Sequence, residues 1–438
     1  MLQEMHKQNS SPVPVRPGPE VTAGQSFAGE IYIAPASIST KDGKTRISAR
    51  IRVGNEDKTL WFEVDAAYGQ CFADDTLDGF VAASLIPAIL RGENIRTGGV
   101  MSSRLYYNLT NYLIPILSDY LQVPRLTHII PAGGLGTAYV RRGTGVAAGF
   151  SGGIDSFCNY YDHSGDRAPA EFQLTHLIFN NVGSHGQKEA ESDRALFRKR
   201  YLRLMSCAAL LEKPAISVDS NLDAFIGQTF QLTHTLRNTA VALLMQHEIC
   251  KFQYSSGYPL AETKLGPDYN MSRLDPVIMP LLSTERLECT AAGGQHTRVE
   301  KTRRVAEIPA SRVYLDVCVT PQNAPEGYSN CAICWKCIRT ATTLKVFGKL
   351  EEYHKVFHRG NFNTFENLYL IEVMGGKSPF AGEIRDLIHE RKHKIPRSVR
   401  IIAKLLPAPI AQQMSIRIIP ALIPHRRFAK FVNWCLSW

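Results

Sequence analysis

The stretch Gly149-Phe150-Ser151-Gly152-Gly153-Ile154-Asp155-Ser156 decides how the middle of this 438-residue chain is interpreted. Residues 146–150 are apolar or small and predict a short buried strand, and the pattern from Ile154 onward predicts a helix. A glycine-rich loop between a strand and a helix favours anions, because backbone N–H groups point outward there and the helix dipole attracts negative charge. The two serines add hydroxyl donors, and the glycine pair lets the backbone approach a phosphate closely. The stretch therefore predicts a bound phosphate or pyrophosphate.

Two other interpretations of the same stretch are weaker. A Ser-Gly-Gly turn can be simple punctuation between a strand and a helix. Glycines 143, 145 and 149 suggest a dinucleotide fingerprint, but their spacing does not fit G-x-G-x-x-G. The stretch is not a Walker A loop either, because no Gly-Lys-Ser/Thr follows it.

Length and composition indicate a globular protein of two or three domains, with 44% hydrophobic and 21% charged residues. Its longest clean apolar run, 81–90, is far shorter than the ~18–20 residues that span a bilayer. The N-terminal sequence has no signal-peptide pattern, and the Pro, Ser and Gly content of residues 1–26 predicts a flexible segment. We therefore expect a reducing cytoplasmic location, where clustered cysteines suggest metal before disulfide.

Residues 27–125 predict a small α+β accessory or substrate domain. Alternating patterns at 30–33, 45–53 and 60–64 indicate three antiparallel strands, and helical patterns follow at about 75–91 and 103–121. A protein partner could bind through this domain.

From 126 to 350, strand and helix patterns alternate. The predicted strands are 126–131, 146–150, 174–181, 215–218 and 252–255, and the predicted helices are 154–163, 188–212, 232–250 and 331–349. Each strand is continuously apolar, as in a parallel sheet that is covered on both faces. This predicts an α/β fold with a Rossmann-like, doubly wound parallel sheet whose ligand lies at the carboxyl ends of the strands. Residues 351–438 predict a helical, basic C-terminal extension.

Four of the ten cysteines fall within twenty residues. Cys318, Cys331, Cys334 and Cys337 form the pattern C-x12-C-x2-C-x2-C, which suits a tetrahedral structural zinc ion. An iron–sulfur cluster and a packed turn of reduced cysteines are the alternatives.

The S-G-G-x-D-S loop together with this distal cysteine pattern resembles the PP-loop ATP pyrophosphatases, and within them the 7-cyano-7-deazaguanine synthase branch. The resemblance covers residues 145–347. It implies a ligase that splits ATP into AMP and pyrophosphate, adenylates a carboxylate or carbonyl group, and couples it to ammonia or an amine. It also implies Mg²⁺, a structural zinc ion and often a homodimer. By this resemblance the pyrophosphate loop is Ser151, Gly152, Gly153, Asp155 and Ser156, the later Pro…Lys segment is Pro280-Leu281-Leu282 with Lys301, and the zinc ligands are the four cysteines.

The chain also departs from that family. The acidic residue that follows the family's lysine is absent from Lys301-Thr302-Arg303-Arg304, and the insertion 283–299 is long. The N-terminal domain and the basic tail have no counterpart in the small synthase. Longer relatives of the synthase lie beside antiviral defence genes, which by analogy suggests an acyl substrate on a protein partner rather than a free deazaguanine.

Further site residues follow from chemistry and position. Asp155 is the expected metal-side carboxylate, or else an acid that interacts with the helix dipole. Lys301 and Arg237 are the expected cations toward the phosphates or the substrate carboxylate. Asn180 and His185 follow the strand at 174–181 and are expected in the ligand wall.

The tail carries the whole net charge of +10, because residues 391–438 contain ten Lys and Arg and no Asp or Glu. Its basic and apolar residues interleave, which suggests an anionic membrane surface, nucleic acid, or terminal helices that pack on the body. The protein would then be cytoplasmic or peripheral to a membrane.

Two functions compete with the ligase. A PP-loop enzyme for nucleobase or tRNA thiolation would need a catalytic cysteine near the loop, for which Cys158 is the candidate. A non-catalytic nucleotide-binding module that assembles a protein complex is the other alternative.

Overall fold

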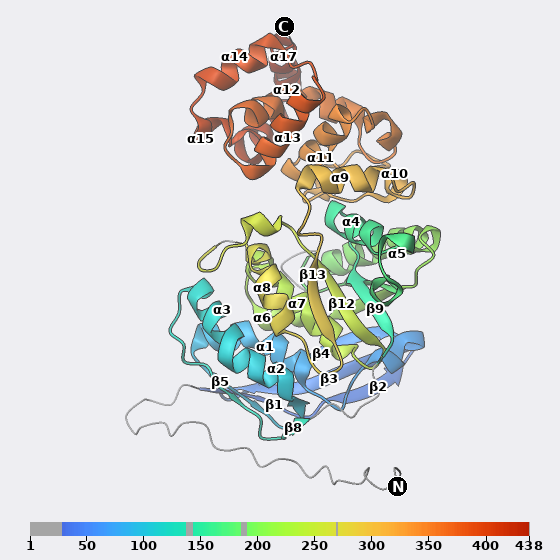
Figure 1. The fold of residues 1–438 in the computed structure, drawn as a ribbon, viewed down its shortest axis with the longest axis vertical. Helices are drawn as coiled ribbons and strands as arrows, with labels where there is room; N and C mark the ends of the chain where they lie inside the picture. The colour runs from blue at the N-terminus through green and yellow to red at the C-terminus, as the bar shows by residue number, and fades with distance from the viewer. Residues whose placement is uncertain (1–28, 137–142, 185–190, 269, 438) are drawn as a thin grey trace, which may run out of the picture.

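A computed structural model describes residues 29–136, 143–184, 191–268 and 270–437. The protein has a mixed α/β fold, in which one large, mostly parallel sheet lies below a layer of C-terminal helices (Figure 1). The α/β prediction is therefore confirmed. The segment 1–26 that was predicted to be flexible lies outside the described residues.

The central sheet has the strand order β13-β12-β9-β10-β11-β4-β3-β1-β5-β7, with β2 paired to β3. The strands are β1 (Glu30–Ile33), β2 (Ser37–Lys41), β3 (Lys44–Val53), β4 (Glu56–Asp65), β5 (Asn94–Thr97), β7 (Ile129–Ile130), β9 (Gly145–Gly149), β10 (His176–Asn180), β11 (Ala215–Ser220), β12 (Ile249–Ser255) and β13 (Glu288–Ala292), while β6 (Met101–Ser102) and β8 (Leu135–Gly136) pair separately.

The half of the sheet from β13 to β11 is entirely parallel and is buried on both faces. Successive side chains of β9 alternate between two cores, because Val146 and Ala148 belong to one hydrophobic cluster and Ala147 to the other. This explains why the strands read as continuous apolar runs. Strand β13 was not predicted, since it lies inside the segment 283–299 that was interpreted as an insertion.

The N-terminal strands continue the same sheet instead of forming a separate one. Strand β4 pairs antiparallel with β11, where Glu63 lies opposite Asp219. The Asn221 side chain extends this junction by accepting from Trp61 N and donating to the Thr59 carbonyl, at 2.9 and 2.8 Å. Part of the strand predicted at 126–131 is β7, which pairs with β5 in this half of the sheet. The two halves also share one apolar core.

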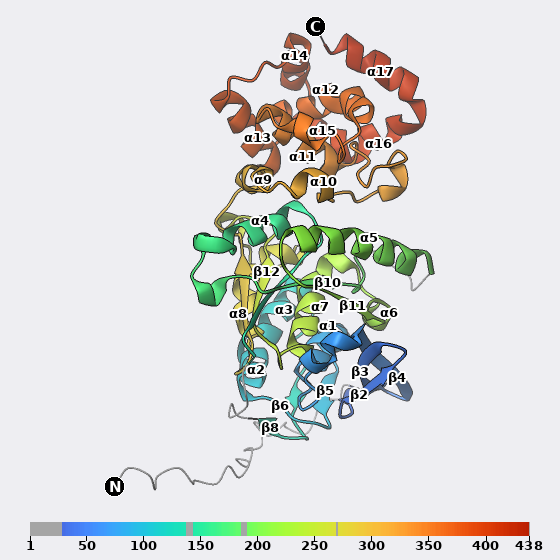
Figure 2. The ribbon, with the colours of Figure 1, turned by 90° about the vertical axis from the view of Figure 1, so that its right-hand side faces the viewer.

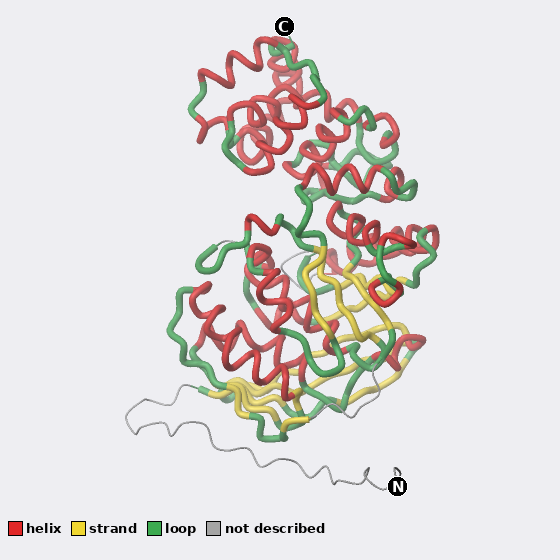
Figure 3. Tube along the Cα trace, in the orientation of Figure 1, coloured by secondary structure: helices red, strands yellow, loops and turns green. Residues whose placement is uncertain are grey.

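Helices cover both faces of the parallel half of the sheet, whereas the N-terminal strands have helices on one face only (Figures 2 and 3). The helix predicted at 232–250 ends earlier, at Leu244, and β12 follows after a short turn. The α-helices are α1 (Asp78–Arg91), α2 (Ser103–Asn108), α3 (Ile114–Leu121), α4 (Ile154–Asp162), α5 (Glu191–Leu210), α6 (Leu222–Ile226), α7 (Phe230–Leu244), α8 (Asp275–Leu281), α9 (Arg298–Ala306), α10 (Ser311–Tyr314), α11 (Trp335–Val346), α12 (Arg359–Gly375), α13 (Pro379–Glu390), α14 (Arg397–Leu405), α15 (Ala408–Ala411), α16 (Ile419–Leu422) and α17 (Arg426–Cys435).

The C-terminal extension is built around α12, which contacts α13, α14 and α17. It lies at the end of the molecule opposite the N-terminal strands in both views (Figures 1 and 2). Among the described residues, no helix combines the length and the apolar character that crossing a bilayer requires.

Candidate anion-binding site and metal centre

The Ser-Gly-Gly loop connects β9 to α4 in a conformation that only glycine adopts without strain at its centre. Gly152 has φ +74°, and a Cβ added there would lie 2.9 Å from Leu204 Cδ2. The Gly152 carbonyl accepts a hydrogen bond from Asp316 N at 2.7 Å, which fixes the loop. Helix α4 has Gly153 as its N-cap and no side-chain capping bond. Its first-turn N–H groups are therefore left for a ligand.

This loop faces a cavity of about 680 Å³ at the carboxyl ends of the strands. The chain runs from β9 to β10 and β11 on one side, and then returns to β12 on the other side of β9. Such a reversal of strand order opens a crevice where ligands bind in α/β sheets. The cavity is lined by the loop, the ends of β10 and β12, and side chains from α5, α9 and α11.

Asp155, in the first turn of α4, is held by two cations from α9. Its Oδ1 lies 2.8 Å from Arg298 Nη1 and 3.0 Å from Lys301 Nζ. Burial opposes the charge of this carboxylate, but Arg298 and Lys301 outweigh burial and lower the pKa of Asp155. Lys301 is 1% exposed and also donates to the Ser256 carbonyl. The structure thus brings two predicted catalytic residues, Asp155 and Lys301, together as an ion pair.

Two further cations line the cavity without a carboxylate partner. Arg339 is 7% exposed, its Nε is buried without a hydrogen-bond partner, and its guanidinium carbon lies 4.1 Å from the Phe380 ring centroid. Burial lowers the pKa of Arg339 to about 10, and burial also lowers the pKa of Lys336, one turn earlier on α11. Within the described ranges, neither side chain forms a salt bridge. Arg339 is buried and Lys336 is half-buried, and carboxylates such as Asp155 act on both only from beyond ion-pair distance. A desolvated cation without a direct ion pair is costly, so the position of these two side chains at the cavity favours an anionic ligand.

Three carboxylates line the cavity, and two of them form salt bridges with cationic side chains of the protein. Asp155 is paired as described, and Asp316 Oδ2 lies 3.4 Å from Arg200 Nε and 4.0 Å from Arg203 Nη1. Asp193 is the third carboxylate of the lining. The donor set therefore fits a phosphate better than it fits a Mg²⁺ ion, which prefers several oxygen ligands.

Four of the other predicted loop and wall residues lie at the cavity, and Gly152 is not part of its lining. Ser151, Gly153 and Ser156 line it, and Ser156 Oγ donates to the Gly153 carbonyl at 3.1 Å. Asn180 also lines it and donates to Asn238 Oδ1 at 2.9 Å, while its own Oδ1 is buried without a partner. His185 lies outside the described residues.

Arg237 lies away from the cavity wall and serves the fold. It is fully buried, and its guanidinium donates to Asp223, Thr233 and the carbonyls of Val182 and Gln228, at 2.6 to 2.7 Å. With four of its five donors used by the protein, Arg237 ties α7 to the loop after β10. The segment Pro280-Leu281-Leu282 is likewise absent from the cavity lining.

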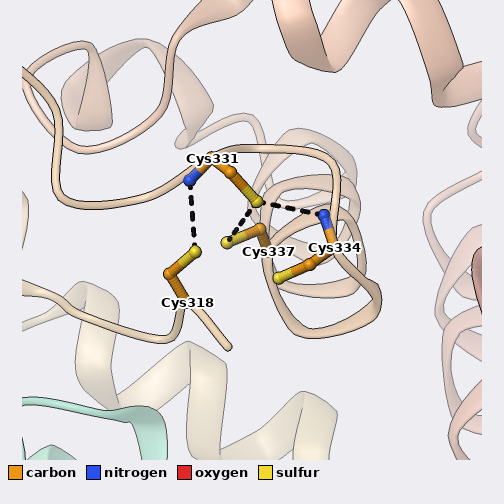
Figure 4. Close-up of side chains that lie close together, drawn as sticks. All are labelled: Cys318, Cys331, Cys334 and Cys337. Atoms are coloured by element: carbon orange, nitrogen blue, oxygen red, sulfur yellow. Dashed lines mark hydrogen bonds between the residues drawn. The ribbon is translucent and has the colours of Figure 1, made fainter. Parts of the chain in front are cut away.

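The four cysteines converge at the start of α11, although twelve residues separate Cys318 from the others (Figure 4). All four are buried, and their sulfur atoms lie within 4.8 Å of one another. Cys331 Sγ lies 3.9 Å from Cys337 Sγ, close to the roughly 3.8 Å between sulfurs in a tetrahedron with ~2.3 Å Zn–S bonds. A hydrogen bond from Cys318 lowers the pKa of Cys331 to about 7. The cluster can therefore bind a metal such as zinc, as predicted.

The metal centre and the cavity share one helix. Cys334 is the N-cap of α11, and Lys336 and Arg339 follow in its first turns. A metal ion bound by the four cysteines would hold the start of α11 in place, and with it the side chains of Lys336 and Arg339. Sequence reasoning assigned no role to Lys336, Arg339 or Arg298. The i, i+3 spacing of Lys336 and Arg339 on either side of Cys337 was the available signal for the first two.

A second group of potential ligands, Cys158, Asp162 and His296, is explained by hydrogen bonding alone. Asp162 Oδ2 lies 2.8 Å from His296 Nε2, and its Oδ1 accepts from Arg304 Nε at 3.1 Å. Cys158 is fully buried, and burial, followed by the charge of Asp162, raises its pKa to about 12. This group ties α4 to α9, and Cys158 is not part of the cavity lining.

Comparison with known proteins gave no match to a family model, to a curated protein or to a solved structure.

Proposed function

We propose that this protein is an ATP-dependent ligase that forms AMP and pyrophosphate, with a Rossmann-like PP-loop domain around β9 and α4. It would adenylate a carboxylate or carbonyl group and couple it to ammonia or an amine. The observation that supports this proposal most strongly is that the uncapped start of α4 faces a cavity in which Lys336 and Arg339 form no salt bridge with a carboxylate.

In the first step a substrate carboxylate oxygen attacks the α-phosphorus of ATP, and pyrophosphate leaves. The charge that develops on the leaving group needs fixed donors in a site with little water. The first-turn N–H groups of α4 would hold the pyrophosphate, and Arg339 and Lys336 would stabilise its charge. In the second step a neutral amine attacks the acyl carbon, AMP leaves, the nitrogen releases one proton to water, and a C–N bond replaces the C–O bond.

Asp155 has a positioning role in this scheme. Its two ion pairs hold α9 against the start of α4, so Lys301 acts through Asp155 rather than on a phosphate. Because the cavity carboxylates are largely paired with protein cations, they offer few free oxygen ligands to a Mg²⁺ ion. A zinc ion at the four cysteines would be structural, since four thiolates leave no open coordination position.

The thiolation alternative is disfavoured by geometry, because the buried thiol of Cys158 does not face the cavity. The alternative of a non-catalytic assembly module would bind nucleotide in the same cavity. It differs from the ligase because it would not convert ATP into products. That the protein forms a homodimer, and that a protein partner binds at the N-terminal strands, are still predictions.

The proposal is tested by analysing the nucleotide products of the full chain. ATP is incubated with an extract of small acids and peptides and with ammonium, and products are separated chromatographically. We expect AMP and pyrophosphate, and loss of both with Arg339→Gln. Production of ADP would refute the ligase. Tight ATP binding without turnover would favour the assembly module instead.

A further inference from the structure

The C-terminal helices expose an unusual number of large apolar side chains. Seven lie on the segment from α14 to α17 and are 47 to 77% exposed: Ile401, Leu405, Ile410, Ile416, Phe428, Phe431 and Trp434. We call these residues, with the basic residues between them, the tail surface. Ile401 and Leu405 lie four residues apart on α14, and Phe428, Phe431 and Trp434 lie three apart on α17, so each of these helices exposes an apolar stripe. Exposed apolar stripes on a folded chain mark an interaction site.

Helices α14 and α17 pack against the C-terminal core through one side only. Val399 and Ala403 of α14 and Ala429 of α17 are buried against the C-terminal core. Ser398 Oγ of α14 donates to the Leu436 carbonyl at 2.6 Å, which ties the start of α14 to the residue that follows α17. Other large residues of the segment, including Met414, Ile419 and Leu436, are buried as well, so only part of its apolar side chains remains exposed.

The charge of this region has one sign. Residues 391–438 contain ten Lys and Arg and no Asp or Glu. Arg400 and Lys404 of α14, and Arg427 and Lys430 of α17, are exposed beside the apolar residues. A ligand that complements this surface must be anionic and must also accept aliphatic and aromatic side chains.

We propose that the tail surface binds the interfacial region of a bilayer that contains anionic lipids. Short amphipathic helices that combine Lys and Arg with Phe, Trp and Leu insert their apolar side chains at the headgroup boundary, while the basic residues contact acidic headgroups. Nucleic acid fits less well, because its interfaces are polar and would gain little from exposed Ile401 and Leu405. Since no described helix can cross a bilayer, the tail surface would lie on the membrane.

Vesicle sedimentation with the full chain tests this inference independently of catalysis. The probes are phosphatidylcholine vesicles with and without phosphatidylglycerol. We expect binding only with the anionic lipid, and binding at least about tenfold weaker in Arg427→Glu/Lys430→Glu and in Phe428→Ser/Phe431→Ser. The matched controls are Lys41→Glu/Lys199→Glu and Tyr107→Ser/Tyr112→Ser, which change exposed residues elsewhere and should bind as the parent does.

Three results would overturn the inference. They are absence of binding to anionic vesicles, equal binding to neutral vesicles, and equal losses in the control variants. If binding to anionic vesicles is absent and the tail surface instead retains an acidic protein, the surface is a protein interface.

Discussion

Lys301 Nζ lies 3.0 Å from Asp155 Oδ1, and this ion pair joins α9 to the first turn of α4. Arg298 reaches the same oxygen from one turn earlier on α9. The acidic residue of the S-G-G-x-D-S stretch is thus neutralised by the protein itself. The unneutralised positive charge of the cavity lies on α11, at Lys336 and Arg339.

Replacement of Asp155 by Asn should destabilise the fold, because it leaves buried Lys301 without its counter-charge. We expect a loss of about 2–3 kcal/mol in the free energy of unfolding by urea, below the full value of a buried pair because the Asp155 side chain is 30% exposed. Asp166→Asn, at an exposed position, is the control. A change within about 0.5 kcal/mol of the parent would show that the pair does not stabilise the fold.

The same pair predicts a pH dependence. Because the pKa of Asp155 is lowered in the folded state, its stabilising contribution is present above the unfolded value of about 3.9 and is lost as pH falls through the folded pKa. The stability difference between the parent and Asp155→Asn should therefore be constant near neutral pH and shrink toward strongly acidic pH. Urea titrations at several pH values measure it. A difference that grows on acidification would contradict the assignment.

Arg339→Gln and Lys336→Gln should weaken the binding of ATP and of inorganic pyrophosphate by about 10- to 100-fold each. Their thermal stability should stay equal or rise, because each change removes a desolvated cation that has no partner. Calorimetric titration and thermal unfolding measure the two effects. Lys355→Gln, at an exposed position outside the cavity lining, is the control. If Arg339→Gln unfolds the protein while the control does not, the arginine is structural.

The metal centre should couple to ligand binding through α11. We expect about one zinc ion per chain by elemental analysis, and its loss in Cys334→Ser. Cys435→Ser, which changes an exposed cysteine outside the cluster, should keep the ion. Because Cys334 caps the helix that carries Lys336 and Arg339, metal loss should also weaken pyrophosphate binding. Unchanged binding by a metal-free, folded protein would disprove the coupling.

Arg237→Lys should separate a structural role from a catalytic one. Lysine cannot supply four hydrogen bonds from a fixed planar group, so we expect a loss of about 2–4 kcal/mol in stability. Pyrophosphate affinity should change little at a temperature where the variant is folded. A specific loss of affinity with unchanged stability would restore Arg237 as a site residue.

Local patterns made the loop, the cysteine cluster and most of the parallel strands predictable. The glycine pair sets the β9–α4 turn, and three cysteines at short spacing already share one turn. Long-range pairings were not predictable, because nothing near Glu63 or Asp219 in sequence indicates that β4 and β11 pair. One acceptor of Arg237 was hidden for the same reason, because the Val182 carbonyl lies 55 residues away in sequence. The other three acceptors, Asp223, Gln228 and Thr233, lie within 14 residues of Arg237, but nothing in the local sequence indicates that all three converge on its guanidinium.

The nucleotide products formed from ATP test the central claim most directly. The full chain with zinc is incubated with ATP, ammonium and a mixture of small acids and peptides, and phosphorus NMR follows the products. The account predicts equal amounts of AMP and pyrophosphate, both abolished by Arg339→Gln. Formation of ADP and phosphate, or no turnover of bound ATP with any acid, would contradict it.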